Sequence, residues 1–174
     1  MIGMDAKTFN ISIFTENSIG VLNRITIIFT RRHLNIESIT ASISEIEGVY
    51  RYTIVVETTE NQVKKVVGQI EKQVEVLKAF YHTDEDVVYQ EIALYKVATN
   101  KLLGSSESIL RKHNARILTI EEGFTIIEKT GHPEELKQLF DDLSNYGVLE
   151  YVKSGRVAIS KPMKTLESYL NELN

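Results

Sequence analysis

The chain has 174 residues, of which 43% are hydrophobic and 25% are charged, and its formal net charge is −4. This composition is typical of a globular protein with one medium domain or two small ones. The absence of cysteine excludes disulfides, thiolate metal sites and cysteine nucleophiles, and the net charge gives no large basic field for nucleic acid or anionic lipid. No apolar run is long enough to span a bilayer, and the start MIGMDAKTFN lacks the features of a signal peptide. We therefore expect a cytoplasmic protein that binds neither nucleic acid nor membrane.

The first half of the chain switches between the hydrophobic periods of strands and helices. Apolar residues at every second position predict strands, and apolar residues three or four positions apart predict one face of a helix. In chain order the pattern predicts a strand at 9–13, a helix at 21–29, strands at 36–44 and 50–56, a helix at 63–70 and a strand at 74–81. This β-α-β-β-α-β order is that of ferredoxin-like folds.

The same order of elements then begins again. We expect a strand at 87–99, a helix at 106–113, strands at 117–121 and 124–129, a helix from Pro133, and extended segments at 149–152 and 156–160. Both repeats carry a basic run that ends in histidine, Arg31–His33 and Arg111–His113, at the end of their first helix. A recurring order of elements indicates an internal repeat. The predicted fold class is therefore α+β, with two tandem ferredoxin-like βαββαβ units.

The acidic run Asp84-Glu85-Asp86 marks the expected junction between the two units. We predict a first domain at 1–83, a second domain at 84–161, and a short helical tail at 162–174 with its helix from Thr165 to Leu173.

No pattern in the sequence indicates a catalytic or metal-binding site. The glycines are scattered, with neither GxGxxG nor GxxxxGK[ST], and the four histidines are too isolated for a zinc site from one element. Tyr50 and Tyr52, on the third strand of the first unit, are placed like the stacking aromatics of an RNA-recognition module. The basic and glycine positions of that module are missing, so we favour a packing role for both tyrosines.

The loop before the first helix contains groups that could bind a small ligand. Gly20 allows a positive φ and a close approach of the backbone at the point where the helix begins. The first N–H groups of a helix lack partners inside it and stabilise a carboxylate without a basic side chain. Asn17 on the same loop, and Asn35 before the next strand, add amides that suit a small zwitterion. The simpler alternative is that Asn17 or Ser18 caps the helix and Asn35 turns the chain.

A resemblance adds to these observations. ENSIGVLNRITIIFTRRHLNIESI resembles the ACT-domain signature of the acetolactate synthase (acetohydroxyacid synthase) small regulatory subunits, N-x-x-G-V-L-x-R followed by F-x-R-R-x-x-N-I-E-S. QIEKQVEVLKAF, the segment 90–96 and Thr130-Gly131 are also similar to the family, and KSGRVAISK at 153–161 resembles its closing RSGxxxxSR. Ile19 stands where members often have proline, and His33 where many have glycine.

The resemblance implies a non-catalytic regulatory subunit in the biosynthesis of valine, leucine and isoleucine. Such subunits form homodimers through their ACT domains, bind a branched-chain amino acid, usually valine, at the dimer interface, and activate a large catalytic subunit. Thiamine diphosphate, magnesium and FAD are then expected only in that partner, and this chain should hold no metal, cofactor or catalytic residue. The expected effector-binding residues are Asn17, Ile19, Gly20, Val21, Asn35 and Ile36, the last two acting across the interface.

Two alternatives stay open at this point. A free-standing ACT-type amino-acid sensor that acts on a different enzyme would share the first domain and would not need the second. A small enzyme on a ferredoxin-like fold would need a reactive constellation, which the sequence does not display.

Overall fold

The computed structural model describes residues 6–102, 106–162 and 168. The chain forms two compact units, one of Met1–Val88 together with Arg156–Asn174 and the other of Tyr89–Gly155. Within the described residues, no helix is long and apolar enough to cross a membrane.

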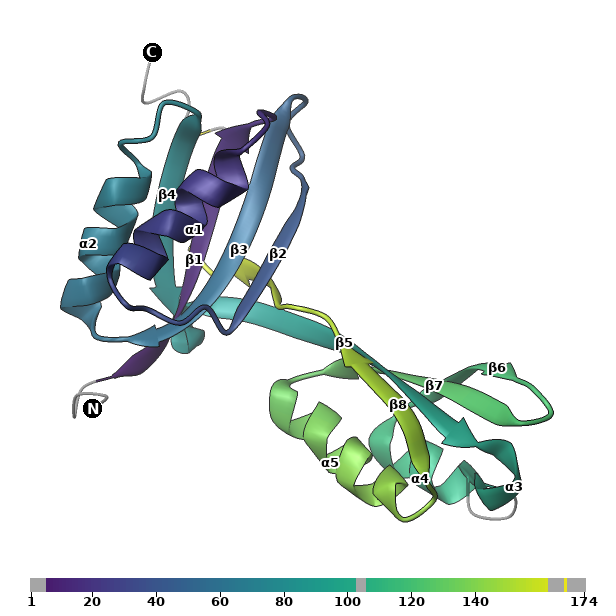
Figure 1. The fold of residues 1–174 in the computed structure, drawn as a ribbon. Coiled ribbons are helices and arrows are strands. Elements are labelled where there is room, and N and C mark those ends of the chain that lie inside the picture. The colour runs from purple at the N-terminus through teal and green to yellow at the C-terminus, as the bar shows by residue number, and fades with distance from the viewer. Residues whose placement is uncertain (1–5, 103–105, 163–167, 169–174) are drawn as a thin grey trace. The chain divides into compact units, whose positions relative to one another are not determined.

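The first unit is an antiparallel sheet with both of its helices on one face (Figure 1). Its elements are β1 (Lys7–Glu16), α1 (Val21–Arg31), β2 (Ser38–Ile43), β3 (Val49–Thr58), α2 (Glu60–Ile70) and β4 (Val76–Thr83), followed by the short 3₁₀ turn η1 (Asp84–Asp86). The strands lie in the order β2-β3-β1-β4. The predicted β-α-β-β-α-β order is thereby confirmed for this unit.

The core of the first unit lies between the sheet and its helices. Alternate residues of β1 and β3 face α1 and α2, and the buried cluster contains Phe9, Ile11, Ile13, Val21, Ile25, Phe29, Ile54, Val63, Val66 and Ile70. Tyr52 is buried in the same cluster and Tyr50 packs against it. Both tyrosines therefore lie on the helix-covered face of the sheet, where they are unavailable to stack on nucleic-acid bases.

The second unit repeats this architecture. Its elements are β5 (Val87–Ala98), α3 (Thr99–Leu102), α4 (Ser106–His113), β6 (Arg116–Ile120), β7 (Phe124–Gly131), α5 (Pro133–Ser144) and β8 (Val148–Lys153). The order β6-β7-β5-β8 is equivalent to that of the first sheet, and α4 and α5 cover one face (Figure 1). The buried Tyr95 hydroxyl donates a hydrogen bond of 2.7 Å to the Leu136 carbonyl, which joins sheet to helix. The prediction of two ferredoxin-like units is confirmed, whereas the short helix α3 was not predicted.

The boundaries of the two compact units differ from the expected division of the chain. The first unit continues to Val88, and it also contains Arg156 and the strand β9 (Val157–Ser160), which we expected in the second domain. The reason is that this segment forms hydrogen bonds with β2, β3 and η1. As a strand, β9 pairs with β5, which leads out of the first unit, and an extended period in the sequence does not reveal this partner. The expected tail helix, Thr165 to Leu173, lies outside the described residues apart from Ser168.

The helices α1 and α4 end in the same left-handed turn. His33 has φ 55° and Asn114 has φ 49°. The next residues, Leu34 and Ala115, donate backbone hydrogen bonds to the carbonyls five positions earlier, as in a Schellman motif. His33 therefore corresponds to Asn114, so the two basic runs seen in the sequence are offset by one residue in the structure.

We expect His33→Gly to raise the free energy of unfolding by about 1 kcal/mol, because a non-glycine residue in the left-handed region carries strain that glycine relieves. His33 is exposed, so the substitution removes no core contact. Chemical denaturation measures the effect. Asn114→Gly is the matched control and should give a smaller gain, because asparagine adopts this conformation more easily. A loss of stability in His33→Gly would contradict the prediction.

Candidate functional site

The loop between β1 and α1 opens the helix with a glycine. Gly20 is the N-cap residue, with φ 85° and ψ −2°, and it has no side-chain cap. A Cβ atom built on Gly20 would lie 3.2 Å from Nη1 of Arg24. Both the left-handed backbone and the limited space therefore favour glycine here.

The structure contradicts the alternative in which Asn17 or Ser18 caps this helix. No side chain caps α1, and the Val21 N–H donates to the backbone carbonyl of Ser18 over 3.4 Å. By contrast, the Thr59 hydroxyl caps α2 by accepting from the Gln62 N–H at 3.4 Å. The first turn of α1 is therefore open to a ligand that accepts hydrogen bonds.

The side chains around Gly20 are divided between core and solvent. The Val21 side chain is 1% exposed and belongs to the core, so only its backbone can meet a ligand. Ile19 is fully exposed, and Asn17 is exposed as well.

Asn35 and Ile36 lie beyond the opposite end of α1, in the connection to β2. The helix has eleven residues, so it separates Gly20 from this connection by about 16 Å. One chain therefore does not bring the six predicted residues together. The two groups, Asn17 to Val21 and Asn35 with Ile36, lie at different ends of one helix. We call them the two predicted half-sites.

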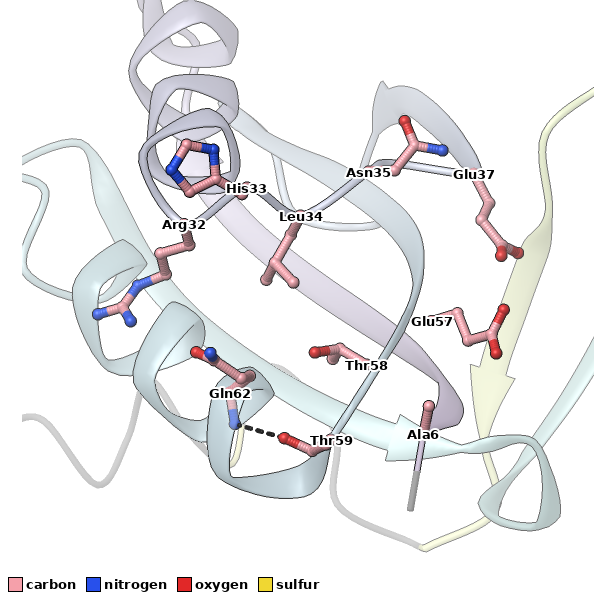
Figure 2. A pocket seen from close by; sticks show the side chains of 10 residues that line it. All are labelled: Ala6, Arg32, His33, Leu34, Asn35, Glu37, Glu57, Thr58, Thr59 and Gln62. Carbon is pink, nitrogen blue, oxygen red and sulfur yellow. Dashed lines mark hydrogen bonds between the residues drawn. The ribbon is translucent and has the colours of Figure 1, made fainter. Parts of the chain in front are cut away.

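A pocket of about 410 Å³ lies beside Asn35. Figure 2 shows Glu37 and Glu57 next to each other on one side of it, and His33 and Gln62 on the other. The Oε1 atom of Gln62 is buried and has no hydrogen-bond partner among the described residues. Two carboxylates and a free amide oxygen suit a positively charged donor such as an ammonium group.

The sequence analysis missed this pocket. Glu57 and Gln62 are more than twenty residues from Asn35 in the chain, and only the pairing of β2 with β3 brings their regions together. Glu37 donates its backbone N–H to the Val55 carbonyl at 2.9 Å, which ties the connection to the end of β3. An alternation pattern cannot predict this register, because it identifies the faces of a strand and not its partner.

The histidines do not form a metal centre. In the part of the chain that the structure describes, no group of three or more potential ligands could hold a metal ion. Nε2 of His113 lies 2.7 Å from Oδ2 of Asp142, and Lys112 Nζ lies 2.6 Å from the same oxygen. These hydrogen bonds, from Lys112 first and then from His113, hold the pKa of Asp142 below its usual value. The cluster is a helix-to-helix contact of the second unit.

The strand β2 forms one edge of the first sheet. On its helix-facing side, Ile39 is 36% exposed and Ile43 is 71% exposed. An edge strand presents unpaired backbone groups, and exposed apolar residues along it favour pairing with another chain. This edge follows directly after Asn35 and Ile36.

Two family descriptions together match most of the chain. Residues 11–78 match the AHAS small subunit-like ACT domain, and residues 90–162 match the small subunit of acetolactate synthase. These ranges correspond to the two structural repeats.

Individual relatives agree with this result. The acetolactate synthase small subunit of Bacillus subtilis is 35% identical over 153 residues, which cover 87% of this chain and 89% of the relative. A probable acetolactate synthase small subunit of Archaeoglobus fulgidus is 34% identical, over 88% of this chain and 97% of the relative. The crystal structure of the acetolactate synthase small subunit from Thermotoga maritima is 27% identical and has a TM-score of 0.82, covering 91% of this chain and 99% of that one.

The match therefore extends over both repeats and nearly the whole length of the relatives. The chain belongs to the acetolactate synthase small-subunit family, as a regulatory subunit with an amino-terminal ACT domain.

Proposed function

We propose that this chain activates a separate large catalytic subunit of acetolactate synthase and confers feedback inhibition by a branched-chain amino acid, with valine as the effector. The observation that carries the effector proposal is the uncapped, glycine-opened start of α1. In this proposal the chain is not catalytic by itself. Thiamine diphosphate, magnesium and FAD belong to the large subunit, and the cytoplasmic location stays a prediction from the sequence.

The effector carboxylate would bind at the start of α1. The backbone N–H groups around Ile19, Gly20 and Val21 are the donors, and the partial positive charge of the helix N-terminus adds to them. Asn17 contributes a side-chain amide from the same loop. Each hydrogen bond to the carboxylate is charge-assisted and therefore stronger than one between neutral groups.

The rest of the effector would meet Asn35 and Ile36 of a second copy. Since α1 separates the two half-sites of one chain, an amino acid cannot span both of them, whereas a two-fold interface pairs each half-site with the other. The pocket beside Asn35 supports this assignment, because Glu37, Glu57 and the free Oε1 of Gln62 favour an ammonium group nearby.

The exposed edge of β2 supports a homodimer of the ACT domain. A two-fold contact at this edge would bury Ile39 and Ile43 and would satisfy unpaired backbone groups of β2. It would also bring both copies of the Asn35 connection close to the interface.

A free-standing ACT-type sensor that acts on another enzyme is the alternative. It accounts for the first unit equally well. The family match over residues 90–162 favours the acetolactate synthase subunit, because a sensor that acts elsewhere has no need of this second domain.

Gly20→Asp should abolish most effector binding, because it places a carboxylate and a Cβ where the effector carboxylate binds. Losing one charge-assisted hydrogen bond costs roughly 1.5–3 kcal/mol, or about a ten- to hundred-fold weaker Kd. Asn35→His should weaken binding as well. Calorimetry with valine, leucine and isoleucine measures both effects.

The matched control for this experiment is Gly123→Asp. Gly123 has no atom within 4 Å of a built Cβ, so the same charge is added in open space in the other unit. Its affinity for valine should stay at the wild-type value. Unchanged affinity in Gly20→Asp would contradict the proposed carboxylate site.

The protein should sediment as a dimer at micromolar concentration. Ile43→Arg should shift it towards monomer, because the substitution places a charge on the apolar edge of β2. Sedimentation velocity with and without valine makes the comparison. A wild-type monomer under both conditions would argue strongly against an effector site shared between two copies.

The purified chain should produce no acetolactate from pyruvate with thiamine diphosphate and magnesium, and it should raise the rate of a cognate large subunit. Gly20→Asp should keep this activation while losing the response to valine, since docking does not require the effector. Turnover by the isolated chain, after contaminating large subunit is excluded, would refute the regulatory assignment.

A further inference from the structure

The face of the first sheet that turns away from α1 and α2 is lined with polar residues. Asn10, Ser12 and Thr53 point to this face, and each is at most 5% exposed. The segment Arg156–Lys161, here called the strap, is hydrogen-bonded to Asn10, Thr40 and Arg51 of the first sheet. It contains most of the KSGRVAISK motif, which the effector site does not use.

Arg156 anchors the strap in the interior of the first unit. Its side chain is 6% exposed, and Nη1 donates to Oδ1 of Asn10 at 3.0 Å and to Oδ1 of Asp84 at 2.7 Å. Nδ2 of Asn10 donates to the same Asp84 oxygen at 2.7 Å. The three side chains, from β1, η1 and the strap, form a closed hydrogen-bonded triangle.

The remainder of the strap pairs with β5 as the strand β9, and further hydrogen bonds reach its backbone. The Thr40 hydroxyl donates to the Arg156 carbonyl at 2.9 Å, and Nη2 of Arg51 donates to the Ala158 carbonyl at 2.6 Å. At the far end, the Lys161 N–H donates to the Asp86 carbonyl at 2.8 Å. The sheet therefore supplies donors to the strap from both β2 and β3.

These contacts define a single register. Ala158 is 4% exposed and faces the sheet, while Val157 and Ile159 are each about two-thirds exposed, at 65% and 66%. A slip by one residue would exchange the two faces. It would also move the buried Arg156 charge away from Asp84, which is costly because an unpaired buried charge loses its solvation without compensation.

The strap follows the second unit directly in the chain. It is hydrogen-bonded to β2, the strand of the first unit that comes after the proposed effector residues Asn35 and Ile36. Arg156 directly follows Gly155, the last residue of the second unit, and the chain enters that unit directly after Val88. Thr40 lies in β2, four residues after Ile36. One hydroxyl thus connects the strand that follows the proposed effector half-site to the chain that leaves the second unit.

We propose that the strap transmits effector binding from β2 to the second unit through the Thr40–Arg156 hydrogen bond. The inference rests on the proposed effector site. An effector bound at Asn35 and Ile36 orders β2, favours the seated strap over a partly released one, and so restrains the chain at Gly155. The effector shifts this equilibrium because it binds the state with ordered β2 more tightly.

Hydrogen exchange tests the transmission directly on the full chain. In the wild type, saturating valine should slow amide exchange of residues 157–161 about fivefold or more, the lower end of usual coupling factors. Thr40→Val removes the hydroxyl at nearly constant volume and should abolish this slowing. Its affinity for valine should fall by no more than the same factor, because coupling between binding sites is reciprocal.

Two further variants complete the experiment. Thr53→Val is the matched control, since Thr53 is the cross-strand partner of Thr40 and has no hydrogen bond to the strap among the described residues. It should respond to valine as the wild type does. Arg156→Lys keeps the charge and loses the guanidinium geometry, and it should also lose the valine response. With the large subunit, Thr40→Val should keep activation and show a lower maximal inhibition.

The outcomes separate the two proposals. If calorimetry shows valine binding but exchange of the strap is unchanged in the wild type, the transmission is refuted and the effector function stands. An unchanged response in Thr40→Val also refutes the transmission. If no branched-chain amino acid binds the wild type, the proposed effector site fails, and the role of the strap falls with it.

Discussion

The guanidinium group of Arg156, buried between Asn10 and Asp84, constrains the course of the whole chain. A buried charge is stable only where its partners are in place, so the strap has one position on the first sheet. Because of this, residues that follow the second unit in sequence belong to the first unit. The second unit is thus an insertion between Val88 and Arg156. The two repeats share the same strand order.

The position of α1 imposes a second constraint, on function. The helix places the glycine-opened loop at one end and the Asn35 connection at the other, and its length keeps the two half-sites of one chain apart. In the proposed site, a small effector would reach both only where two copies meet. The exposed edge of β2 lies next to one half-site, so dimerisation and effector binding would reinforce each other.

The polar groups of the second unit are largely engaged in structural contacts. Glu91 is 5% exposed and accepts from Lys153 at 2.7 Å, and Glu135 caps α5 by accepting from the His132 N–H at 2.7 Å. Such pairs join elements of the second unit to one another.

Apart from the short helix α3, the sequence by itself determined the order of elements in both repeats. It also determined the apolar faces that form the two cores and the left-handed turn at Gly20, because periodicity and glycine preference are local properties. It also identified the family through a motif that runs over the first helix. Tertiary structure alone decided that Arg156–Ser160 closes the first unit, that Glu57 and Gln62 meet Asn35 in one pocket, and that no side chain caps α1. The physical reason is that alternation identifies the two faces of a strand, whereas its partner and register depend on contacts between residues far apart in the chain.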